Sequence, residues 1–128
     1  YTTGNTLSLH DALPISCHEI TNDVTLAEAD LPRFARAGGF QGAERSRAEP
    51  NRWKISPLKL EEPGGLDAEP LGPEPVWKDG AGLGSVDSGG YGYAAGAFLA
   101  WAYLRTDLEA PGTALDMMTL GATRAAHA

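Results

Sequence analysis

The sequence has almost no cysteine and no hydrophobic run long enough for a bilayer. Cys17 is the only cysteine among 128 residues, so no disulfide can form within the chain, as is usual for proteins of reducing compartments. The most apolar run, residues 94–104, is about half as long as a membrane-spanning helix must be. We therefore expect no membrane partner.

Basic residues are also scarce, with 10 Lys and Arg against 17 Asp and Glu and a net charge of −7. The basic residues between Arg33 and Lys54 are interspersed with Glu44 and Glu49, which favours a solvated surface over a cationic patch. Binding to nucleic-acid phosphates requires clustered Lys and Arg. The charge distribution therefore predicts no nucleic-acid partner.

Turn-forming residues are what the sequence has in plenty, with 16 Gly and 9 Pro. Such a composition is typical of short strands joined by tight turns. A chain of this length has room for one domain with a core of modest size.

The first sixteen residues differ in origin from the rest of the chain, since they read as a translated sequencing adaptor. Residues 6–15 read TLSLHDALPI, which is the in-frame translation of a common sequencing adaptor, and Ser16 fits the junction. We therefore expect residues 1–16 not to be native and leave them out of the fold prediction, including the acid–base pair that His10 and Asp11 would suggest. What remains opens at Cys17 without an initiator Met, and we expect the gene to have been cut upstream.

The segment before residue 50 predicts short helices. Thr25 followed by Glu28 is the pattern of a capping box at a helix start, and Pro32 would interrupt that helix soon afterwards. A strand is expected to begin at residues 34–36, and a second short helix is expected over residues 43–49, ended by Pro50.

After residue 50 the pattern becomes that of strands. We expect a strand from Trp53 to Leu60 with a bulge at Ser56–Pro57, followed by a hairpin of residues 75–86 that turns at Asp79–Gly80. A glycine-rich turn is expected at residues 88–92, followed by strands at residues 98–104 and 115–120. Residues 121–124 would then turn into a last strand that the chain end truncates. Five or six short strands with frequent turns predict a mainly β fold, either a small antiparallel barrel or a sandwich.

Three patterns suggest chemistry, and each has a simpler interpretation. Residues 90–95 match the dinucleotide-binding pattern G-x-G-x-x-A, but the apolar run after them is aromatic and β-prone, and too little chain remains for a second βαβ unit. A metal site built on Cys17, His18 and Glu19 lacks a second spaced pair of ligands, and His127 lies at the chain end. We predict no metal site and no dinucleotide site.

The third pattern is the glycine-rich segment itself. Ser88 has no histidine placed to activate it as a nucleophile, so a structural hydroxyl is the simpler interpretation. Tyr91 and Tyr93 flank Gly92 and could pack internally or contact a ligand or a neighbouring domain. The candidate ligand- or domain-facing residues are therefore Ser88, Gly90, Tyr91 and Tyr93, and no catalytic residue is predicted.

An ordered series of motifs resembles the C-terminal barrel of the glycine cleavage T-protein family. The series consists of residues 75–80 (PVWKDG), 84–93 (GSVDSGGYGY), 102–104 (AYL) and 110–115 (APGTAL), preceded by residues 18–29 and 39–42. The resemblance implies a C-terminal antiparallel barrel over residues 50–128. It also implies that residues 17–49 are the tail of a folate-binding domain and a connector, which we expect to be loose without that domain.

Within the family, the chain looks most like the barrels of dimethylglycine and sarcosine dehydrogenases. This likeness is carried by the G-G-Y-G-Y run, by residues 77–80 and by residues 18–21. That resemblance implies a parent protein that oxidises a small N-methyl amine with FAD and passes the one-carbon unit to tetrahydrofolate. Its partners would be upstream folate-binding and flavin domains of the same chain, in a bacterial cytoplasm or, for a eukaryotic protein, the mitochondrial matrix. A stand-alone aminomethyltransferase and an independent β-barrel binding module are the alternatives.

The resemblance places no catalytic residue in this chain, because the family's catalytic Asp and main folate contacts would lie upstream of Cys17. The fragment alone is therefore expected to be inactive and to bind neither cofactor. Four positions depart from the family pattern: Ala43 replaces the usual Arg, Asp87 a frequent Thr, Ala97 a frequent Lys, and Gly38 a frequent Asp or Lys.

Overall fold

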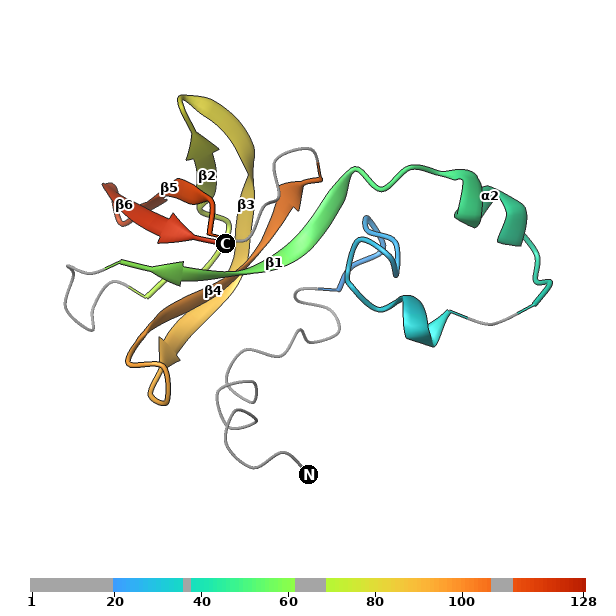
Figure 1. The fold of residues 1–128 in the computed structure, drawn as a ribbon, viewed down its shortest axis with the longest axis horizontal. Helices are drawn as coiled ribbons and strands as arrows, with labels where there is room; N and C mark the ends of the chain where they lie inside the picture. The colour runs from blue at the N-terminus through green and yellow to red at the C-terminus, as the bar shows by residue number, and fades with distance from the viewer. Residues whose placement is uncertain (1–19, 36–37, 62–68, 107–111) are drawn as a thin grey trace.

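The computed structural model describes residues 20–35, 38–61, 69–106 and 112–128. Six strands form one closed barrel in the order β1-β4-β3-β2-β5-β6, and every neighbouring pair is antiparallel (Figure 1). The strands are β1 (Trp53–Leu60), β2 (Pro75–Lys78), β3 (Ala81–Gly92), β4 (Ala97–Arg105), β5 (Ala114–Thr119) and β6 (Ala122–His127). The prediction of a mainly β, antiparallel fold is confirmed, and the fold is a barrel rather than a sandwich.

Strand β1 is continuous, so the bulge predicted at Ser56–Pro57 is wrong. Its pairing with β4 keeps one register from Trp53 opposite Arg105 to Lys59 opposite Leu99. Proline lacks an N–H and is tolerated in a strand where one edge has no partner. The other neighbour of β1 is β6, which pairs with it at Lys59 and Leu60, so Pro57 fits without a bulge.

The two tightest hairpins turn through left-handed residues. Asp79 and Gly80 have φ of 51° and 78° between β2 and β3, and Leu120 and Gly121 have φ of 49° and 80° between β5 and β6. Positive φ at both central residues is the type I′ geometry whose twist matches antiparallel strands. The Asp79–Gly80 prediction is confirmed, whereas the strand predicted to include Leu120 ends at Thr119 because Leu120 lies in the turn.

Two register shifts bend the sheet into a barrel. One lies between Val76 and Trp77 in the β2–β3 ladder, and the other between Val86 and Ser88 in the β3–β4 ladder. A bulge adds a residue to one strand and increases its local twist and bend. The long strand β3 can therefore pair with β2 at one end and with β4 along most of its length.

The interior is filled by alternate residues of the strands. Along β4, Phe98, Ala100, Ala102 and Leu104 are all buried, while the residues between them are half-buried. Small residues on this strand leave space for larger side chains from the other strands, including Leu58, Leu83 and Met117, which are each at most 1% exposed. This pairing of small with large side chains is typical of narrow barrels.

The last strand completes the ring. Each of the six residues of β6 pairs with β5, and Ala126 and His127 also pair with Leu60 and Lys59 of β1. The strand thus closes the ring with β1, and the turn expected over residues 121–124 is wrong beyond Gly121, because β6 already begins at Ala122.

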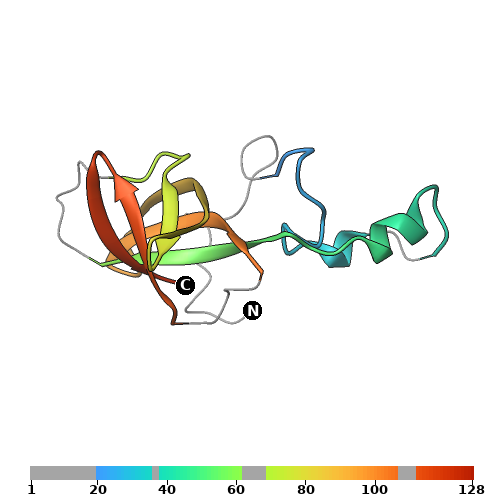
Figure 2. The same ribbon diagram turned by 90° about the horizontal axis from the view of Figure 1, so that it is seen from above.

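Ahead of the barrel, residues 25–51 form an extension that we call the arm. It contains a turn at residues 26–30, the 3₁₀ helix η1 (Pro32–Phe34) and the helix α2 (Ala43–Ala48), and its far part projects away from the barrel (Figure 2). The second short helix is thus confirmed, whereas the helix predicted after Thr25 is wrong, because residues 26–30 form only a turn before Pro32. The strand expected to begin at Phe34 is wrong, because Pro32 starts a 3₁₀ turn that takes in Phe34. Among the described residues, no helix is long and apolar enough to cross a membrane.

Candidate functional site

The predicted glycine-rich turn is a strand. Ser88, Gly90 and Tyr91 all lie in β3, and the chain turns only afterwards, at residues 93–96. The glycines are there because the strand packs tightly: a Cβ at Gly89 would lie 2.5 Å from Pro70 Cγ and 2.9 Å from Leu99 O. Glycine in a strand often marks such a close approach, which the sequence alone could not distinguish from a turn.

The structure separates the four candidate residues. Ser88 is half-buried and pairs with Trp101 of β4, and Gly90 pairs with Leu99. Tyr91 packs edge-on against both Phe98 and Tyr93, with ring centroids 5.1 Å and 5.2 Å apart. Tyr93 is 83% exposed and is the one of the four that lies in the turn, whereas Ser88, Gly90 and Tyr91 are each half-buried.

The dinucleotide pattern of residues 90–95 is not in a dinucleotide-binding context. A Rossmann motif needs a helix after the glycines, and here they lead through a turn into the antiparallel strand β4. Cys17, His18 and Glu19 lie outside the described residues. Within the described ranges no group of three metal-ligating side chains occurs, and His127 Nε2 lies 2.6 Å from Glu61 Oε1 on the surface.

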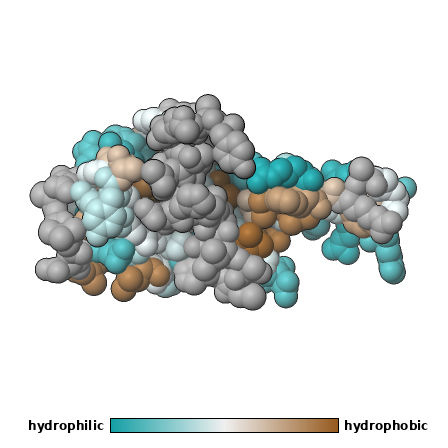
Figure 3. Space-filling view, turned by 90° about the horizontal axis from the view of Figure 1, so that it is seen from below, coloured by the Kyte–Doolittle hydropathy of each residue, from teal (hydrophilic) through white to brown (hydrophobic). Residues whose placement is uncertain are grey.

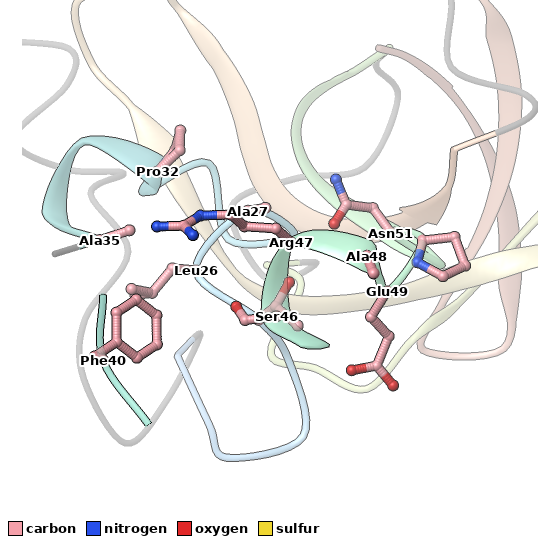
Figure 4. A pocket seen from close by; sticks show the side chains of 12 residues that line it. Leu26, Ala27, Pro32, Ala35, Phe40, Ser46, Arg47, Ala48, Glu49 and Asn51 are labelled. Atoms are coloured by element: carbon pink, nitrogen blue, oxygen red, sulfur yellow. The ribbon is translucent and has the colours of Figure 1, made fainter. Parts of the chain in front are cut away.

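An apolar groove lies in the arm. It has a volume of about 900 Å³ and is lined by residues of the 25–27 turn, of η1 and its C-cap, and of α2 with the residues after it. Leu26 and Phe40 lie beside each other on one side, and the Arg47 side chain extends toward that side, whereas Glu49 lies on the opposite side (Figure 4). Leu26 is 43% and Phe40 39% exposed, and hydrophobic side chains gather along one face of the arm (Figure 3). An exposed apolar surface of this kind is typical of a contact with another domain or protein.

A smaller groove of about 520 Å³ lies where the arm meets the barrel. Its aromatic residues are Trp53 and Tyr103, with Gly82 and Gly84 of β3 beside them, and Arg52 and Asp23 add charge. The Arg52 guanidinium is already engaged there, since it donates to the Asp23 carbonyl oxygen at 3.0 Å.

Between these grooves, Glu28 joins the arm to the first strand. Its carboxylate is 1% exposed, and both oxygens accept hydrogen bonds. Oε2 accepts from the Thr25 N–H at 2.8 Å, and Oε1 accepts from the Arg52 N–H at 2.8 Å and the Trp53 N–H at 3.3 Å. The Thr25 hydroxyl in turn accepts from the Glu28 N–H at 3.1 Å, which confirms the predicted capping box.

These contacts set the charge of Glu28. Burial alone would raise the pKa of its carboxyl, but hydrogen bonds from the N–H groups of Thr25, Arg52 and Trp53 and from the Arg52 side chain outweigh it. The pKa of Glu28 therefore lies below its ordinary value, and the group is ionised at neutral pH. The capping-box contacts between Thr25 and Glu28 could be predicted from the sequence. Nothing in the sequence indicates that Arg52 and Trp53, 24 and 25 residues away, also bind Glu28.

The barrel strands are also the part of the chain that matches a known family. Residues 54–128 match the glycine cleavage T-protein C-terminal barrel domain. The chain belongs to this family. A search of curated proteins finds no sequence that matches it.

A solved structure supports the same fold for this T-protein barrel. The glycine cleavage system aminomethyltransferase T from Bartonella henselae superimposes on 93% of the chain with a TM-score of 0.77 at 21% sequence identity. Identity at this level shows the fold alone. The chain spans 34% of the length of that protein.

Proposed function

We propose that this chain is the C-terminal part of a folate-dependent protein that transfers a one-carbon (aminomethyl) unit. The observation on which the proposal rests is the family match of residues 54–128, over a barrel whose six strands close. The active site would lie in the part of the parent protein that precedes this chain, because the family resemblance implies that the catalytic Asp and the main folate contacts lie upstream of Cys17.

The arm supports a larger parent. The superposition on the aminomethyltransferase covers 93% of this chain, more than the barrel alone, so part of the segment before the barrel also has a counterpart there. The apolar face of the arm is the surface that an upstream domain would cover. We propose that residues 17–49 are the tail of a folate-binding domain and its connector, that residues 50–128 form the barrel, and that residues 1–16 derive from the adaptor.

A finer proposal is that the parent is an FAD-dependent dehydrogenase of the dimethylglycine or sarcosine type, acting on a small N-methyl amine. The support is the sequence likeness of residues 77–80 and of the G-G-Y-G-Y run. Tetrahydrofolate and FAD would be bound by upstream domains of the same chain, in a bacterial cytoplasm or a mitochondrial matrix. A stand-alone aminomethyltransferase is the second candidate, because its barrel has the same fold.

The experiment is to recover the continuous reading frame upstream of the Cys17 codon and express the whole protein. We would measure formation of 5,10-methylenetetrahydrofolate from tetrahydrofolate, together with the absorption spectrum of any bound flavin. Product formation with bound flavin and an N-methyl amine supports the dehydrogenase, and product formation without flavin from an aminomethyl donor supports the transferase. A complete protein that neither binds tetrahydrofolate nor forms the product would contradict the proposal and favour an independent binding module.

A further inference from the structure

The arm is tied to the barrel at its base. Beyond the carboxylate contacts of Glu28, the Ile55 N–H donates to the Glu28 carbonyl oxygen at 2.8 Å, so both the side chain and the backbone of this residue bind the start of β1. Ala29 beside it is 2% exposed. The base of the arm is thus buried, and both the carboxylate and the backbone carbonyl of Glu28 accept hydrogen bonds from the start of β1.

The hydrogen bonds of the outer arm are local within the described residues. The hydrogen bonds described for residues 32–49 each join two residues of the arm, as when Arg47 donates to the Gly38 carbonyl oxygen at 2.9 Å. Helix η1 buries no residue, and α2 buries only Ala43. The views from the front and from above both show this part standing clear of the barrel (Figures 1 and 2).

We propose that Glu28 is a latch: its buried carboxylate fixes the orientation of the arm, and hence of the apolar groove, relative to the barrel. The groove includes Thr25, Leu26 and Ala27, which precede the latch in the chain, and Pro50 and Asn51, which lead into its partner Arg52. The two ends of the segment that lines the groove are therefore held together at Glu28. Opening it would release the arm and leave the barrel strands paired.

The charge of Glu28 is essential to the latch. Among the described residues, the hydrogen bonds to its two oxygens all come from N–H groups, of Thr25 on one side and of Arg52 and Trp53 on the other. A glutamine has nearly the same shape, but its amide group presents one acceptor and one donor, so one set of N–H groups would lose its partner. A buried donor left without a partner costs far more than an ordinary hydrogen bond contributes.

Hydrogen–deuterium exchange of the full chain tests the latch. We would compare wild type with Glu28→Gln, using Glu44→Gln on the exposed surface of α2 as the matched control. The proposal predicts that Glu28→Gln speeds exchange of the amides at residues 25–31 and 52–53 by about tenfold to a hundredfold, with amides of β3 to β6 unchanged. The control should behave as wild type.

Two results would overturn the proposal. One is unchanged exchange at residues 25–31 in Glu28→Gln. The other is an equal loss of protection in every strand, or failure of the variant to fold, because Glu28 would then belong to the cooperative core of the barrel. A measurement on wild type alone gives a second test: in low urea the Thr25 amide should exchange through a local opening that costs less than opening the amides of β4, and identical costs would contradict the latch.

Discussion

Substituting Gly89 tests why the glycine run is there. A Cβ at this position would meet Pro70 Cγ at 2.5 Å and the Leu99 carbonyl oxygen at 2.9 Å, and the second of these is a backbone atom of the neighbouring strand. Gly82 lies in the same strand with nothing within 4 Å of its Cβ position, so it provides a matched control. Neither glycine has the positive φ that would by itself strain an alanine.

The two substitutions should have opposite signs. An alanine where glycine is not required stabilises a protein by about 0.4–1 kcal/mol, because the unfolded chain loses conformational freedom. Forcing a methyl group into a close-packed site costs about 1–3 kcal/mol. We therefore expect Gly82→Ala to be as stable as wild type or slightly more so, and Gly89→Ala to be less stable by about 1–2 kcal/mol, with Tm lower by roughly 4–8 °C for each kcal/mol.

Urea unfolding followed by tryptophan fluorescence measures both effects. Trp53, Trp77 and Trp101 lie on three different strands, so the signal reports on the barrel as a whole. The slope of the unfolding free energy against urea should stay the same, since the exposed area does not change. If Gly89→Ala had the same urea midpoint as Gly82→Ala, the close approach of β3 to Pro70 and β4 would be refuted.

Three other predictions follow from the core, the latch and the adaptor. Leu58→Ala should lower the free energy of unfolding by about 2–5 kcal/mol because Leu58 is fully buried, whereas Leu120→Ala, at a site 75% exposed, should change it by less than about 0.5 kcal/mol in the same urea assay. The pKa of Glu28 is lower in the folded chain than its ordinary value of 4.5, so its ionised form adds stability above that value. This contribution is lost as pH falls through the lower folded-state pKa, and the difference between wild type and Glu28→Gln in exchange at residue 25 should vanish on acidification; a constant difference would contradict it. Deleting residues 1–16 should leave the thermal midpoint and the exchange pattern of the barrel unchanged, and a marked loss of either would show that these residues belong to the fold.

The features that could be predicted from the sequence are those decided by neighbouring residues. The turn at Asp79–Gly80 follows from the left-handed conformation that these two residue types accept, and the capping box from the reach of a glutamate over one helical turn. The strands followed from alternation and from β-branched and aromatic residues.

What could not be predicted depends on residues distant in sequence. A glycine at position 89 suits either a turn or a tightly packed strand, and the packed strand follows from Pro70 and Leu99, which only the fold brings near. The bulges lie where the sheet must bend to close, at Val76 and Val86, rather than at Pro57, which has an open edge. The partners of Glu28 were hidden for the same reason.

Closure of the barrel between its first and last strands is tested most directly by nuclear Overhauser contacts. The structure pairs Lys59 with His127 and Leu60 with Ala126, at the end of a strand order that otherwise would be an open sheet. We predict backbone contacts between these residues in solution, with slow exchange of the Glu61 amide, which donates to the Ala125 carbonyl oxygen at 2.9 Å. Their absence, with β1 and β6 each retaining contacts to β4 and β5 alone, would contradict a closed T-protein barrel.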